Sequence, residues 1–150
     1  MVGWTFVAGQ VVLLVGLVLL PGGDDWPTPP WLRVVAQAMV VAGFVVLVVA
    51  SLRSGRALTP TPVPVERGEL QTGGLYRFVR HPIYSGVLLI VVGITLRSAS
   101  VTTLIVGVVT VVFFSRKARW EEARLAERYP GYVDYAARTP RFVPGGPPRR

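Results

Sequence analysis

The hydrophobic positions of this chain gather into long uncharged runs and do not alternate with polar positions. Four runs, made mostly of Val and Leu, cover residues 4–20, 34–52, 83–96 and 99–114. A membrane-spanning helix needs about 20 apolar residues, with a usual range of about 17–25. The second run fits this length well, the first and fourth fit at its short end, and the third is too short alone. The pattern therefore predicts an all-α integral membrane protein with about four transmembrane helices.

Two other interpretations of the runs fit less well. A soluble helical bundle would carry polar stripes along its helices, and the runs show none. A cleaved signal peptide would need a basic stretch before the first run and a small-residue cleavage site after Leu20. Neither is present, so we expect the first run to be a retained membrane helix.

The third and fourth runs predict one helical hairpin that turns near Arg97. Pro82 suits the first turn of the third helix, where its missing N–H needs no partner. No Gly or Pro follows Val108 until Pro130, so the fourth helix is expected to leave the membrane and continue to that proline. Residues 132–137 can add one or two further helical turns.

Charge is distributed unevenly between the loops. Residues 21–30 carry Asp24 and Asp25 and no basic residue, residues 53–80 carry five arginines, and residues 116–150 carry nine basic residues. With four helices, 14 of the 16 basic residues lie on one side, which the positive-inside rule assigns to the cytoplasm. We therefore expect both termini in the cytoplasm and the helices in a membrane of the bacterial inner (plasma) membrane type.

The net charge of +8 is accounted for by this topology and by contact with membrane lipids. No nucleic-acid-binding motif accompanies it, so a nucleic-acid partner is not expected. The chain has no cysteine, which excludes disulfides, thiolate catalysis and cysteine-bound metals.

Two polar clusters meet the membrane on the predicted cytoplasmic side. The first, residues 80–84, contains His81, the only histidine of the chain, and the second, residues 119–122, contains Glu121 and Glu122. The predicted hairpin brings the two clusters together. Polar groups at a membrane entry are costly unless they serve a function, so this end of the hairpin is the candidate site.

These residues resemble the isoprenylcysteine carboxyl methyltransferase and phospholipid methyltransferase superfamily of integral membrane enzymes. The resemblance covers residues 59–144, and 139–144 look like the C-terminal segment of that family. The family carries G-x-Y-x-x-x-R-H-P-x-Y-x-G, an apolar hairpin, then R-x-E-E-x-x-L and Y-x-x-Y. The matching residues are Gly74, Tyr76, Arg80, His81, Pro82, Tyr84, Gly86, Arg119, Glu121, Glu122, Leu125, Tyr132 and Tyr135.

The resemblance implies a methyltransferase that uses S-adenosyl-L-methionine and no metal. The methyl acceptor would be lipophilic: an isoprenylcysteine-like carboxylate, a lipid or a small hydrophobic molecule. The implied cofactor-binding residues are Tyr76, His81, Pro82, Tyr84, Gly86, Glu121 and Glu122. The implied catalytic residues are Arg119 and Arg80, with Arg119 orienting an acceptor carboxylate or phosphate through its planar fork.

The expected organisation is a single membrane domain over residues 1–150. Residues 1–58 would form two N-terminal transmembrane helices. Residues 59–144 would form the methyltransferase-like half, whose hairpin extends into a cytoplasmic cofactor-binding region. Residues 145–150 would be a disordered tail.

Several alternatives remain open at this point. The chain resembles membrane reductases that use NADPH by analogy of architecture alone, and it could also be a non-catalytic membrane scaffold. Glu121 and Glu122 could instead pair with Arg119 and Arg124 on a solvated helix. Gly86 permits either close helix packing or close approach of a ligand.

Overall fold

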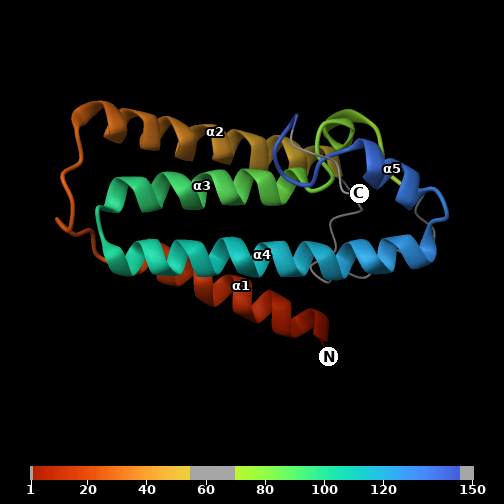
Figure 1. Cartoon of the computed structure of the whole chain (residues 1–150), viewed down its shortest axis with the longest axis horizontal. Coiled ribbons are helices and arrows are strands. Elements are labelled where there is room, and N and C mark those ends of the chain that lie inside the picture. The colour runs from red at the N-terminus through yellow and green to blue at the C-terminus, as the bar shows by residue number, and fades with distance from the viewer. Residues whose placement is uncertain (1, 55–69, 146–150) are drawn as a thin grey trace.

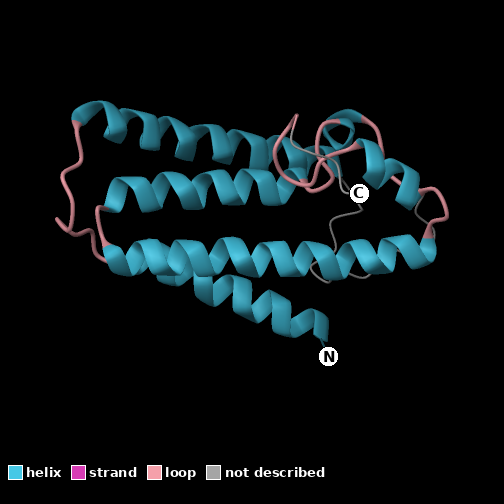
Figure 2. Cartoon of the chain, in the orientation of Figure 1, coloured by secondary structure: helices cyan, strands magenta, loops and turns pink. Residues whose placement is uncertain are grey.

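The computed structural model describes residues 2–54 and 70–145. Its elements are α1 (Val2–Leu19), α2 (Pro30–Ser54), the 3₁₀ helix η2 (Gly74–Arg77), α3 (Pro82–Ser98), α4 (Val101–Arg128) and α5 (Tyr132–Arg138). No strand occurs in these two stretches (Figure 2). The all-α prediction is confirmed, while the predicted tail, residues 145–150, lies outside the described residues except for Gly145.

Two helices are long and apolar enough to cross a membrane: α2 over Pro30–Arg53 and α4 over Val101–Arg128. The apolar helices at Trp4–Leu19 and Pro82–Ser98 are shorter. The 17 residues of α3 extend about 26 Å at 1.5 Å per residue, against a hydrocarbon core of about 30 Å. The structure thus supports two candidate spans, and four crossings remain a prediction.

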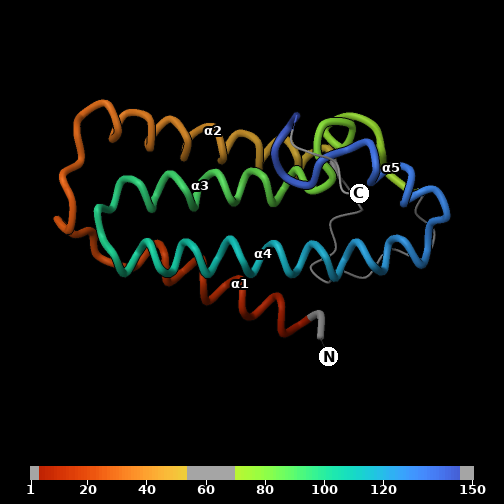
Figure 3. The backbone as a smooth tube through the Cα atoms, viewed as in Figure 1, coloured from red at the N-terminus to blue at the C-terminus, as the bar shows by residue number. Residues whose placement is uncertain are grey.

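The helices form a bundle in which α2 packs along α3, and α4 packs against both α3 and α1 (Figure 1). In the backbone trace, α5, η2 and the segment after α5 gather at one end of the bundle (Figure 3). The turn between α3 and α4 lies at the other end. The hairpin therefore sets the first turn of α3 beside the C-terminal half of α4, as the sequence predicts.

Glycines allow α2 and α3 to approach closely. A Cβ added to Gly86 would lie 2.8 Å from the carbonyl oxygen of Gly43, and one added to Gly93 would lie 2.7 Å from the carbonyl oxygen of Ala36. Real Cβ atoms do not make such short contacts. Small residues at these points let two apolar helices pack backbone to backbone, as membrane helices commonly do.

The α3–α4 turn is fixed by backbone geometry and by capping. Ala99 adopts a left-handed conformation with φ of 48°, which ends α3. Ser100 caps α4 by accepting from the backbone N–H of Thr103, and a carboxylate oxygen of Asp25 accepts from the N–H of Val101 at 2.7 Å. The predicted turn near Arg97 is confirmed, centred two residues further on.

The outer faces of α1 and α2 are apolar. Exposed side chains there include Val11, Val12, Val18, Val34, Val41, Phe44, Val45 and Leu52. Polar side chains are instead buried between α3 and α4, including Thr95, Thr103 and Thr110. Apolar surface outside and polar groups inside is the distribution that a hydrocarbon environment favours.

Candidate functional site

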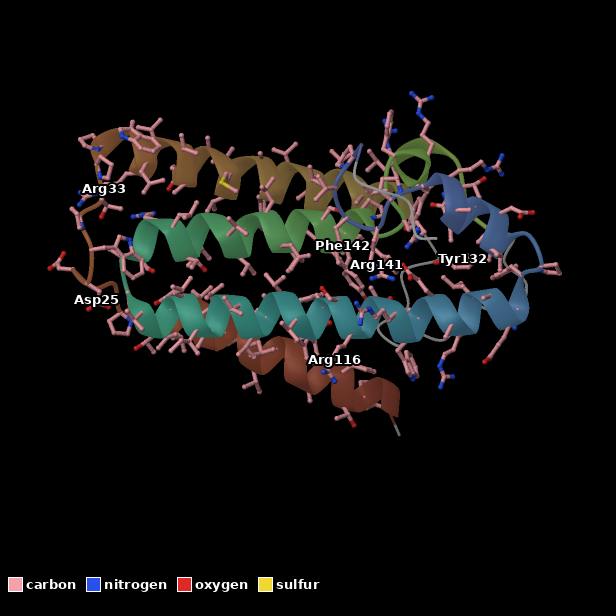
Figure 4. The ribbon with its side chains drawn as sticks, in the orientation of Figure 1. Asp25, Arg33, Arg116, Tyr132, Arg141 and Phe142 are labelled. Carbon is pink, nitrogen blue, oxygen red and sulfur yellow. The ribbon has the colours of Figure 1, made fainter. Side chains whose placement is uncertain are left out.

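A polar cluster forms where three separate parts of the chain meet. Its residues come from the start of α3, from the C-terminal half of α4, and from residues 132–142. Arg141 and Phe142 lie between α3 and α4, with Tyr132 nearby on α5 (Figure 4). The cluster therefore contains both polar groups that the sequence predicts to converge, and adds a third segment.

The third segment is joined to the first through the backbone. The N–H of Arg80 donates to the carbonyl of Pro140 at 2.9 Å, and the N–H of His81 donates to the carbonyl of Arg141 at 3.1 Å. The hydroxyl of Ser85 donates to the carbonyl of Phe142 at 2.7 Å. These bonds hold the chain after α5 against the N-terminus of α3.

Arg80 is buried, with 5% of its surface exposed. Its Nε donates to Glu122 Oε1 at 3.1 Å. Its Nη1 donates to the carbonyls of Ala136 at 2.7 Å and Thr139 at 2.5 Å. Since every contact is made inside the protein, Arg80 connects α3, α4 and α5 and is not an anchor at the membrane surface.

Glu122 is the acidic centre of the cluster. Its Oε1 accepts from Arg80 and from Arg141 Nε at 2.8 Å, and lies 3.2 Å from His81 Nε2. Its Oε2 accepts from Arg141 Nη2. The hydrogen bond to Glu122 raises the pKa of Arg141. Glu122 therefore does not pair with Arg119 or Arg124 along a solvated helix, because its partners come from other segments.

Glu121 belongs to a second, smaller set of contacts. Its Oε1 accepts from the hydroxyl of Tyr84 at 2.6 Å, and its Oε2 lies 3.7 Å from His81 Nδ1. The rings of His81 and Tyr84 stack with centroids 5.2 Å apart and planes 1° from parallel. His81 thus lies between the two glutamates and is oriented by both.

Lys117 brings a buried cation close to this set. It is 4% exposed and donates to Gln10 Oε1 on α1 at 2.6 Å. Its Nζ lies 5.2 Å from the centre of the Tyr84 ring. The contact links the otherwise apolar α1 to the site.

Two tyrosines of α5 border the cluster and behave differently. The hydroxyl of Tyr135 donates to the backbone carbonyl of Tyr76 at 2.5 Å, and burial raises the pKa of Tyr135 to about 12. Burial also raises the pKa of Tyr132. The hydroxyl of Tyr132 is buried without a hydrogen-bond partner, which is uncommon because buried polar groups usually find one.

The structure places the other predicted site residues as follows. Pro82 occupies the first turn of α3, as predicted. Gly86 faces α2 and not the polar cluster, so helix packing explains it without a ligand. Arg119 is exposed. Successive residues of a helix are rotated by about 100°, so Arg119, two positions before Glu121, lies on a different side of α4. Its catalytic role, like the binding role of Gly86, stays a prediction.

Sequence reasoning did not single out Arg141 or Lys117 as site residues. Arg141 stood inside the C-terminal segment that resembles the family, and that segment carried the signal. Lys117 is the only lysine in the chain and stands between Arg116 and Arg119, three residues after an apolar run that ends at Phe114. Gln10 is an isolated amide in the first run, and a polar residue inside an apolar helix is a signal that it has a polar partner.

In chemical terms, the cluster offers both cationic donors and carboxylate acceptors beside flat rings. It can therefore bind a ligand that carries positive and negative groups together with an aromatic or cationic part. In the described part of the chain, no group of three or more His, Cys, Asp or Glu side chains is placed to hold a metal ion.

Comparison with known proteins finds a family match and several relatives. The family described as phospholipid methyltransferase matches residues 31–131. Protein-S-isoprenylcysteine O-methyltransferase B of Arabidopsis thaliana is 31% identical over 134 residues, which cover 85% of this chain and 66% of that protein. Protein-S-isoprenylcysteine O-methyltransferase A of the same plant is 28% identical over 137 residues, covering 87% of this chain and 67% of that protein.

A bacterial relative carries a different name. The nickel-cobalt-cadmium resistance protein NccN of Alcaligenes xylosoxydans xylosoxydans is 29% identical over 136 residues, which cover 89% of this chain and 61% of that protein. The chain thus spans about two thirds of the length of these relatives. No solved structure gives a significant match. Because the family match covers most of the chain and includes both polar groups of the hairpin, the chain belongs to the phospholipid methyltransferase family.

Proposed function

We propose that this chain transfers a methyl group from S-adenosyl-L-methionine to a lipophilic acceptor at the membrane interface. The observation that carries the proposal is the convergence of His81, Tyr84, Glu121 and Glu122 into one cluster. These four residues belong to the two motifs through which the chain resembles methyltransferases of this family. The family match supports the same cofactor class.

The groups in the cluster fit the chemistry of this cofactor. S-adenosylmethionine carries an amino group, a carboxylate, ribose hydroxyls and a cationic sulfonium. Carboxylates suit the amino and hydroxyl groups, guanidinium and imidazole suit the carboxylate, and an aromatic ring suits the sulfonium. The unpartnered hydroxyl of Tyr132 is a further polar atom that a ligand can satisfy.

The two glutamates are suited to different roles. Both oxygens of Glu122 accept hydrogen bonds from arginines, so this residue holds the site together. Glu121 accepts one hydrogen bond, from Tyr84, and its second oxygen lies 3.7 Å from His81. Glu121 therefore has the greater capacity left to accept from the amino or hydroxyl groups of a ligand.

When bound, the cofactor supplies an electrophilic methyl group that the acceptor takes by in-line displacement. The residues of this chain contribute position and a dry environment more than acid or base catalysis. His81 and Tyr84 hold a flat surface against which a ligand can stack, and Arg80 supplies buried positive charge beside it. Arg119 remains the candidate for orienting an anionic acceptor.

We further propose that all four apolar helices cross the membrane and that the cluster lies at its cytoplasmic side. The support is the arrangement of the bundle, in which α1 and α3 run beside the two longer helices (Figure 1). The basic residues of α4 and α5 lie at the end of the bundle that holds the cluster. The positive-inside rule then assigns that end, and both termini, to the cytoplasm.

The test is calorimetric titration of the purified protein in detergent with S-adenosylhomocysteine, with NADPH titrated in parallel. We expect saturable binding of S-adenosylhomocysteine and none of NADPH. His81→Ala should abolish the binding, whereas Glu127→Gln, an exposed carboxylate of α4, should leave it unchanged.

Three results would count against the proposal. Binding of NADPH alone would favour a reductase. No binding of either ligand by folded protein would favour a non-catalytic scaffold. Binding of S-adenosylhomocysteine that is unaffected by His81→Ala would remove the cluster from the cofactor site.

A further inference from the structure

An open groove lies along the outer surface of α2, at the end of the bundle away from the polar cluster. Its volume is about 690 Å³. Its apolar wall includes Val34, Ala38 and Ala42 of α2, and its polar lining consists of Arg33, Gln37 and Arg97. Arg97 comes from the last turn of α3, so residues of two helices line the groove.

The two arginines of this groove are the exceptions to the charge pattern of the chain. The other 14 basic residues follow position 52 on the predicted cytoplasmic side, in residues 53–80 and 116–150. Arg33 and Arg97 alone lie near the other side, Arg33 in the first turn of α2 and Arg97 in the last turn of α3. The positive-inside rule disfavours basic residues there, and both of them line one groove.

Neither arginine has an acidic partner within the described residues. The guanidinium of Arg33 makes no hydrogen bond or ion pair there, and that of Arg97 donates only to the neutral amide oxygen of Gln37, at 3.1 Å. No acidic residue lines the groove. Asp25 lies at the same end of the bundle, but its carboxylate accepts a hydrogen bond from the backbone N–H of Val101. It belongs to the α1–α2 loop and lies apart from Arg33 (Figure 4).

The apolar wall extends from this charged end toward the middle of α2. Val34, Ala38 and Ala42 are spaced four residues apart, so they form a stripe about 12 Å long on one face. The two alanines leave room beside the larger valines of the helix. A positively charged end followed by an open apolar stripe complements a lipid that has an anionic headgroup and an acyl chain.

We propose that the groove binds an anionic phospholipid of the bilayer. The phosphate is held between the guanidinium groups of Arg33 and Arg97, and one acyl chain lies along Val34, Ala38 and Ala42. The lipid thereby connects the first turn of α2 to the last turn of α3. This site is separate from the proposed methyl-acceptor site, which lies at the opposite end of the bundle.

The test is native mass spectrometry of the whole chain in detergent, titrated with dioleoyl phosphatidylglycerol or dioleoyl phosphatidylcholine. We expect phosphatidylglycerol to bind more tightly by about tenfold or more, the scale of effect for two basic side chains near an anionic headgroup. The double variant Arg33→Gln/Arg97→Gln should lose this preference. Arg116→Gln, which removes an exposed arginine outside the groove, should keep it.

A second pair of variants tests the apolar stripe that would hold the acyl chain. Ala42→Phe fills the groove and should weaken binding of phosphatidylglycerol although both arginines remain. Val48→Phe enlarges an exposed residue of α2 outside the groove and should not.

Equal affinity for the two lipids would overturn the proposal. So would a preference that survives the double variant, or one that Arg116→Gln removes equally. If the groove is instead covered by a second copy of the chain, Ala42→Phe will dissociate a dimer and leave the lipid preference intact, which also excludes the proposed occupant.

Discussion

Two nitrogens of Arg141 meet both carboxylate oxygens of Glu122, although the residues are 19 positions apart in the chain. Nε of Arg141 donates to Oε1 at 2.8 Å, and Nη2 donates to Oε2. Arg80 donates to the same Oε1 from a position 42 residues earlier. One carboxylate therefore joins α4 to the start of α3 and to the segment after α5.

Glu122→Gln should destabilise the protein strongly. The substitution leaves the buried guanidinium of Arg80 and the half-buried one of Arg141 without their anion, and breaking such a pair costs about 3–5 kcal/mol. Chemical unfolding in detergent, followed by circular dichroism, measures the change. Glu127→Gln is the matched control and should stay within about 0.5 kcal/mol of the wild type. Equal losses in both variants would mean that the cluster contributes no specific stability.

Gly93→Ala should separate α2 from α3. The added Cβ would lie 2.7 Å from the carbonyl oxygen of Ala36, and overpacking of this kind costs about 1–3 kcal/mol. Gly16→Ala provides the comparison, because no atom lies within 4 Å of its added Cβ and alanine favours helix by about 1 kcal/mol. Thermal unfolding should therefore shift down for Gly93→Ala and not for Gly16→Ala. A stabilised Gly93→Ala would show that the helices are not in close contact there.

Arg119→Lys should lower turnover with little effect on folding or on cofactor affinity. The side chain of Arg119 is exposed and makes no hydrogen bond or ion pair with the described residues, so its replacement removes no internal polar contact. Lysine keeps the charge but loses the planar fork that binds a carboxylate or phosphate through two bonds. Methyl transfer from labelled cofactor and titration with S-adenosylhomocysteine separate the two effects. Parallel losses in turnover and affinity would assign Arg119 a binding role.

Because of Tyr135, the stability of the protein should depend on pH in the alkaline range. Burial raises its pKa from 10.0 to about 12 in the folded protein, so folding favours the neutral hydroxyl. Its contribution is fully present below pH 10 and is lost as the pH rises to about 12. The free energy of unfolding, measured across this range, should fall less steeply in Tyr135→Phe. Identical slopes in the two proteins would show that the Tyr135 hydroxyl is not protected by burial.

The helices were predictable because their signal is local. A long uncharged run specifies an apolar helix by its own length, and Pro82 and Pro130 mark where α3 begins and α4 has ended. The hairpin followed from the short polar turn near Arg97. These features depend on neighbouring residues, so the sequence carried them without knowledge of the tertiary structure.

The pairing between segments was harder to predict from the sequence. The spacing of Glu121 and Glu122 indicated pairing along α4 as readily as pairing across the bundle, and only the structure shows Arg80 and Arg141 beside Glu122. Gly86 lies within a motif implied to bind the cofactor, yet it packs on Gly43 of α2. A linear pattern does not record which face of a helix meets which neighbour.

The position of Arg141 after α5 makes the segment behind that short helix a required part of the site. Glu122 and Arg80 both belong to the α3–α4 hairpin or its entry, so a chain cut directly after Arg138 keeps their contact but loses both bonds from Arg141. The second arginine reaches Glu122 only when the chain has turned back past α5. A truncation or fusion placed at the end of α5 would therefore leave the helices of the hairpin whole and the site incomplete, with Glu122 Oε2 lacking its arginine.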